Sequence, residues 1–179
     1  MIRTMALLIL GLVSAVGSGS AHAQSMVWRS AGTAPVLGTT IRGTTASSFS
    51  ISTSGAVTRV SGDAIRLSQS SVTTPTISIN CGLLKLRGLG ALRHVRITVS
   101  PASTSGAARI TRLRVGSLSG STYRTGSPPP EGSIVTFDIA PLGLLRTATF
   151  SLGMDVALAA NAQSGVHEFD YVVTAELVL

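Results

Sequence analysis

The chain has 179 residues, of which 12% are charged and 4% aromatic, and its formal net charge is +7. A mean hydropathy of +0.45 excludes an intrinsically disordered chain, and the single cysteine, Cys81, excludes a disulfide within the molecule. Abundant Ser, Thr, Gly and Val predict one β-rich domain rather than a helical enzyme.

The N-terminus has the features of a secretory signal peptide. Arg3 supplies a positive start, an apolar run extends from Met5 to Val16, and Ala21-His22-Ala23 fits a cleavage site. We expect residues 1–23 to be removed, 24–35 to form a short arm and 36–179 to form the domain. The alternative is an N-terminal membrane anchor, for which the apolar run is short. Export would place the protein in the periplasm, at the cell surface or outside the cell, with no membrane span after cleavage.

Apolar and polar residues then alternate, as half-buried strands require. The earlier predicted strands carry Phe49 and Ile51; Ile65 and Leu67; Ile77, Ile79 and Cys81; Val95, Ile97 and Val99; Leu113 and Val115; and Val135, Phe137 and Ile139. This spacing puts Cys81 on the core side as a small buried residue, and an intermolecular disulfide is the alternative. Gly82 to Gly90 is predicted as a loop or a short helical turn, and Gly116 to Gly132 as a loop.

Two longer strands are predicted near the C-terminus. Every second residue is apolar or nearly so in the segment from Thr147 to Leu158, and the same alternation is present after Gly165. The turn residues from Asn161 to Gly165 predict that these two strands form a hairpin. Together the segments predict an antiparallel β-sandwich of about eight or nine short strands.

Charge is divided along the chain. Residues 24–130 hold twelve basic residues and one acid, Asp63, whereas residues 131–179 hold six acids and one base, Arg146. Such a division could steer subunits head to tail. Alternatively, the two parts face each other within one sandwich and neutralise locally.

Signs of catalysis are missing from the sequence. His94 and His167 lie at no metal-ligand spacing, and Gly116-Ser-Leu-Ser-Gly120 has Leu where a nucleophile elbow needs Ser. We therefore expect no enzyme activity, no metal and no cofactor. A secreted hydrolase is a distant alternative that would need a pocket joining a histidine to a serine and a carboxylate.

Basic residues suggest one candidate binding face. Arg112 and Arg114 would project from the same side of a strand, and Arg96 lies on another strand. Few aromatic residues accompany them, so we expect no nucleic-acid partner. These arginines could contact an anionic polysaccharide, or they could form an ordinary solvated face.

Four stretches together resemble one family. They are Leu37 to Ser52, Gly55 to Leu67 with Arg59-Val-Ser-Gly-Asp63, Val95 to Pro101, and Phe150 to Gly165 followed by the final strand. Their order and spacing are similar to those of the bacterial secreted domain of unknown function numbered 4402, which is similar in plan to spore coat protein U-like and chaperone–usher pilin domains.

This resemblance implies an immunoglobulin-like sandwich that serves as a non-enzymatic surface or fimbria-like subunit. In such pilins a neighbour's N-terminal extension completes the fold by donor-strand complementation. The partners would be copies of the chain, related subunits and a periplasmic chaperone. The implied contact strand carries Phe169, Tyr171, Val173, Ala175 and Leu177. Alternatively, these side chains fill the domain's own core, or the domain is a monomeric adhesin that binds an anionic glycan through Arg96, Arg112 and Arg114.

Overall fold

The computed structural model describes residues 27–29, 36–80, 92–143 and 146–178, and these residues form an all-β, antiparallel, sandwich-like structure. No helix is assigned within these ranges, and so none there could span a membrane. The strands are β1 (Val27–Arg29), β2 (Val36–Ile41), β3 (Ser47–Ile51), β4 (Val57–Ser61), β5 (Ile65–Arg66), β6 (Thr76–Asn80), β7 (His94–Pro101), β8 (Ala108–Ser119), β9 (Val135–Ile139), β10 (Thr147–Leu158), β11 (Gly165–Glu168) and β12 (Tyr171–Val178).

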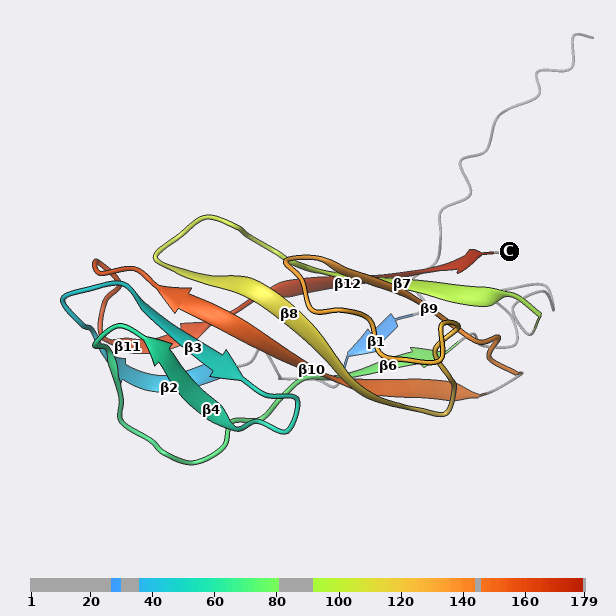
Figure 1. The fold of residues 1–179 in the computed structure, drawn as a ribbon, viewed down its shortest axis with the longest axis horizontal. Helices are drawn as coiled ribbons and strands as arrows, with labels where there is room; N and C mark the ends of the chain where they lie inside the picture. Colours follow the sequence, from blue (N-terminus) through green and yellow to red (C-terminus); the bar gives the residue numbers. More distant parts are fainter. Residues whose placement is uncertain (1–26, 30–35, 81–91, 144–145, 179) are drawn as a thin grey trace, which may run out of the picture.

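The strands form three antiparallel sheets (Figure 1). The large sheet has the order β1-β6-β10-β3-β4, with β8 on the other edge of β10. The β7 sheet has the order β12-β7-β9, and the β2 sheet has the order β11-β2-β5. The long strand β10 organises the fold, because β6 pairs with its first half and β3 with its second half.

A continuous apolar core joins the sheets. It consists largely of the alternate residues that the sequence predicted to face inward. The inward side chains of β3, β6, β7, β9 and β10 are buried, as their alternating patterns predict. Phe137 on β9 meets Phe150 on β10 edge to face, with ring centroids 5.4 Å apart. This contact links the β7 sheet to the large sheet across the sandwich.

The predicted C-terminal hairpin is wrong. β10 does not pair with either strand that follows it, because β8 occupies one of its edges and β6 and β3 occupy the other. The final segment is also divided at Phe169 and Asp170, so that β11 joins β2 and β12 joins β7. The alternation of inward and outward residues continues across this break, as the burial of both Phe169 and Tyr171 shows.

Other boundaries differ in smaller ways. Strand β8 continues to Ser119, so the predicted loop from Gly116 begins later than expected. Strands β8 and β10 have twelve residues each and are not short. The predicted signal peptide, Cys81 and the segment from Gly82 to Gly90 lie outside the described residues.

Candidate functional site

The predicted contact strand contributes to the domain's own core. Phe169, Tyr171 and Val173 are buried, and Ala175 and Leu177 are partly buried against the same core. Strand β12 is nevertheless the edge of its sheet and pairs with β7 alone among the described strands. Every second side chain of β12 therefore faces inward, and the second backbone edge of the strand is not part of a described ladder.

The described part of the predicted arm lies at the edge of the large sheet. Strand β1 pairs with β6 in antiparallel register, from Val27 opposite Ile79 to Arg29 opposite Ile77. It also lies close to β12, as Figure 1 shows. The arm is thus placed where the large sheet and the β7 sheet meet.

Arg96 is held by an acid from the C-terminal part of the chain. Its Nε and Nη2 donate to the two carboxylate oxygens of Asp138 at 2.8 and 3.1 Å, and Arg124 approaches the same carboxylate at 3.4 Å. The hydrogen bond from Arg96 is the main reason why the pKa of Asp138 is lowered. The same contact raises the pKa of Arg96.

Arg112 and Arg114 share two carboxylates. Arg114 donates to Asp155 at 2.5 Å and to Glu131 at 3.1 Å, and it also donates to the Ser50 hydroxyl at 2.7 Å. Arg112 lies 3.7 Å from the same two carboxylates. The two arginines therefore do lie on one side of β8, as predicted.

The three predicted arginines do not form one basic face. Arg96 belongs to the β7 sheet, whereas Arg112 and Arg114 belong to the large sheet. Each is paired with an acid from the C-terminal part, Asp138, Asp155 or Glu131. Of the two interpretations of the divided charge, local neutralisation is confirmed for these residues.

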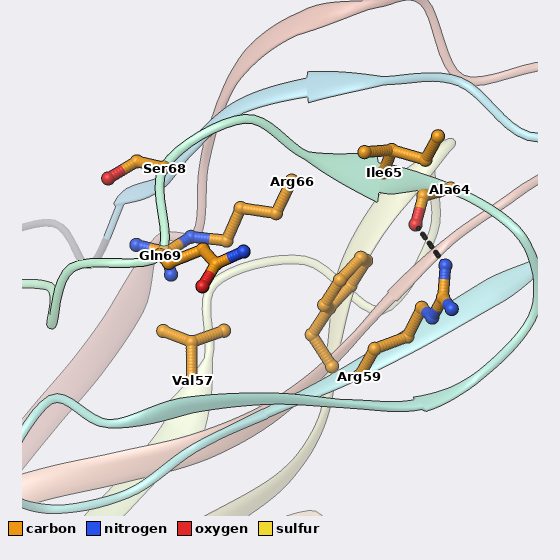
Figure 2. A pocket seen from close by; sticks show the side chains of 8 residues that line it. Val57, Arg59, Ala64, Ile65, Arg66, Ser68 and Gln69 are labelled. Carbon is orange, nitrogen blue, oxygen red and sulfur yellow. Dashed lines mark hydrogen bonds between the residues drawn. The ribbon is translucent and has the colours of Figure 1, made fainter.

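A hollow of about 450 Å³ lies between β4 and β5, where the chain crosses from the large sheet to the β2 sheet (Figure 2). Its lining combines apolar and polar side chains with two arginines. The lining residues are Phe49, Val57, Arg59, Ala64, Ile65, Arg66, Ser68 and Gln69. Sequence analysis missed this site, although Arg59 and Arg66 flank Asp63, the one acid of residues 24–130.

Backbone carbonyls fix both arginines of the hollow. Arg59 donates from Nη1 to Ala64 at 3.1 Å, and Arg66 donates to Leu37 and Ser70, at 2.6 Å each. Partial burial lowers the pKa of Arg66, which stays charged near neutral pH. Arg59 comes from β4 and Arg66 from β5. Figure 2 shows the Arg59 guanidinium turned toward Ala64 and the Arg66 guanidinium beside Gln69, so the two charges lie at different ends of the hollow.

Asp63 fixes the turn at the end of the hollow. Its carboxylate accepts hydrogen bonds from the backbone N–H and the hydroxyl of both Thr44 and Thr45, at 2.7 to 3.0 Å. The side chain approaches Gly43 so closely that an added Cβ there would lie 2.0 Å from a carboxylate oxygen. The next residue, Ala64, donates from its backbone N–H to Ser47. The wall that carries Arg66 is therefore well anchored.

The outer face of the β2 sheet is apolar and exposed. Ile41 lies opposite Ile65, and Val166 and Leu67 flank Thr39 on the same side of the sheet. All four aliphatic side chains are exposed. The predicted alternation around Arg66 is thus present, but its apolar side points to solvent. Exposed patches of this kind favour a contact with another molecule.

His94 and His167, the two histidines among the described residues, each contact a backbone carbonyl. His94 contacts the Ile139 carbonyl at 3.1 Å, and His167 contacts the Gln163 carbonyl at 3.0 Å. Neither belongs to the lining of the β4–β5 hollow or of the smaller one beside Phe169. Within the described ranges, no three His, Cys, Asp or Glu residues stand close enough to hold a metal ion.

Comparisons with known proteins add no relative. No protein-family model, no curated protein and no solved structure matches this chain.

Proposed function

We propose that the chain is an exported, non-enzymatic surface or fimbria-like structural subunit that assembles by donor-strand complementation. The observation that carries the proposal is the position of β1. This three-residue strand pairs with β6 at the edge of the large sheet and lies close to the edge strand β12. A strand donated by a neighbouring subunit would use the same position.

Exchange of this strand is physically reasonable. Only three residues of the arm, Val27 to Arg29, pair with β6. Few backbone hydrogen bonds must break to release it, and the same bonds can form again between two subunits. The exposed apolar face of the β2 sheet adds a second surface that would favour association.

A periplasmic chaperone would act on β12 in this proposal. Its inward side chains, including Val173, complete the core, and its outer edge, which joins no ladder among the described strands, would receive the chaperone strand. A chaperone strand beside β12 would therefore cover this edge until the arm of a neighbour takes the adjacent position beside β6. Export to the periplasm or cell surface is part of the same proposal.

Light scattering after size exclusion tests the proposal. The protein would be purified from the periplasm beside a variant that keeps the signal peptide but lacks Gln24 to Pro35. We expect the full protein to form oligomers, and the shortened variant to stay monomeric and to gain several degrees in Tm when a peptide of Gln24 to Pro35 is added. A scrambled peptide is the control. Full protein that stays monomeric, with a shortened variant indifferent to the peptide, would overturn the proposal.

A further inference from the structure

The hollow between β4 and β5 has the size of a small-molecule site. Its volume of about 450 Å³ falls within the range of roughly 300 to 1,000 Å³ that is typical of ligand pockets. It lies at the opposite edge of the large sheet from β1, because β4 ends the large sheet and β5 ends the β2 sheet. A ligand there would not compete with strand exchange.

Apolar side chains from three strands line the hollow. Phe49 comes from β3, Val57 from β4 and Ile65 from β5. Figure 2 shows Val57 on the β4 side and Ile65 on the β5 side. Phe49 and Ala64, which is also part of the lining, are buried. A hydrocarbon chain lying against these side chains would be withdrawn from water, which favours binding.

Each end of the hollow carries one positive charge. The Arg59 guanidinium lies at the Ala64 end and the Arg66 guanidinium at the Gln69 end, so one small anion does not contact both (Figure 2). Both groups are fixed by carbonyls and retain donors, because Arg59 uses one of its five N–H groups and Arg66 uses two. Each end can therefore bind a carboxylate of its own through charge-assisted hydrogen bonds, with little further loss of side-chain entropy.

The combination of a hollow with two separated charges distinguishes this place from other unpaired arginines. Four further arginines form no ion pair among the described residues: Arg42, Arg93, Arg109 and Arg146. Of these, only Arg109 lines a described hollow, the smaller one beside Phe169, and it shares that lining with the carboxylates of Glu168 and Asp170. The lining of the β4–β5 hollow contains no carboxylate.

We propose that the β4–β5 hollow binds an extended dicarboxylate, with one carboxylate at Arg59 and the other at Arg66. The hydrocarbon chain between the carboxylates would lie against the apolar lining, and the Gln69 amide would add a polar contact at the Arg66 end. A ligand with a single carboxylate leaves one arginine unused, and a short dicarboxylate does not extend from one end to the other. The inference does not depend on assembly by strand exchange.

Titration of the purified wild-type protein, followed by NMR, tests the proposal. The probes are suberate, octanoate and succinate. Octanoate has as many carbon atoms as suberate but a single carboxylate, and succinate has two carboxylates on a shorter chain. We expect suberate to shift the amide signals of Ala64 and Gln69, one at each end of the hollow, and to bind about tenfold or more tightly than either other probe. Added salt should weaken the binding of suberate, because it depends on charge.

Substitutions separate the two ends of the hollow from charge in general. Arg59→Gln and Arg66→Gln should each weaken the binding of suberate by about tenfold or more and remove its advantage over octanoate. Arg146→Gln is the matched control, since it removes an exposed, unpaired positive charge next to the start of β10 and should leave binding unchanged. Because Arg66 donates to two carbonyls, melting curves check that its variant folds, and Arg59→Gln carries the test if it does not.

Three results would overturn the proposal. The first is equal affinity for suberate and octanoate, which would mean that the second carboxylate contacts nothing. The second is equal affinity for suberate and succinate, which would mean that the separation of the two arginines has no role. The third is unchanged affinity for suberate in a folded Arg59→Gln variant. An absence of any shift at Ala64 and Gln69 with suberate would also contradict it.

Discussion

Asp63 shows how one side chain joins two parts of the chain. Its carboxylate accepts four hydrogen bonds from Thr44 and Thr45, those from Thr44 having the larger effect, and they lower its pKa well below the ordinary value of 3.8. The folded state therefore binds this proton less readily than the unfolded state does. The resulting stability is fully present above the unfolded pKa, near 4, and is lost as the pH falls below it.

Replacement of Asp63 tests this linkage. We expect Asp63→Asn to have a lower Tm than the wild type at pH 7, and the difference in Tm to narrow between about pH 4 and pH 2. Thermal unfolding followed by circular dichroism across this range gives both quantities. Asp170→Asn, which changes another exposed aspartate, is the control. A Tm difference that stays constant across the range would contradict the assignment.

Strand β10 needs a glycine at position 153, because neighbouring atoms leave no room there for a side chain. Gly153 lies opposite Arg114 on β8, and a Cβ added there would come within 2.8 Å of both the Arg114 side chain and the Ile51 carbonyl. We expect Gly153→Ala to lower the free energy of unfolding by about 1–3 kcal/mol, because the backbone must shift to relieve the overlap. Gly143→Ala, whose Cβ would make ordinary contacts, should change it by less than about 0.5 kcal/mol. Urea unfolding of both variants measures the difference, and equal effects would contradict this explanation.

For the strands, the sequence predicts where a strand lies along the chain and which residues face inward better than it predicts which strands pair. Alternation is a local property, so the bounds of β10 and the inward residues of β7 and β9 were predicted correctly. The hairpin between β10 and the final strand was not, because the edges of β10 are taken by strands from elsewhere in the chain. Turn residues alone do not reveal this competition. Similarly, the hollow depends on β4 and β5 joining different sheets, which no local pattern indicates.

Across the whole molecule, the divided charge links early and late parts of the chain. Arg96 meets Asp138 on neighbouring strands, and Arg114 meets Asp155 across the β8–β10 ladder. These pairs explain why twelve basic residues can precede six acids without leaving two oppositely charged faces at these sites. They also show that Arg96, Arg112 and Arg114, chosen from the sequence, are each paired with an acid from the late part of the chain.

The two arginines of β8 allow the contribution of this linkage to be measured. Arg114 and Asp155 are 18% and 21% exposed, whereas Arg112 is 57% exposed and lies farther from the same carboxylate. Shielding from water strengthens a close charged hydrogen bond, so we expect double-mutant cycles to give a coupling of about 1–3 kcal/mol for Arg114 with Asp155. The coupling of Arg112 with Asp155 should be below about 1 kcal/mol and should fall further at high salt.

Urea unfolding of the Arg114→Ala, Arg112→Ala and Asp155→Ala variants and of both double variants supplies these couplings. The Arg112 cycle is the matched control, because it uses the same strand, the same acid and the same substitution. Equal couplings would mean that the shielded contact between β8 and β10 adds nothing beyond a surface ion pair. A larger Arg114 coupling would mean that a base from the early part of the chain and an acid from the late part together stabilise the central ladder of the large sheet.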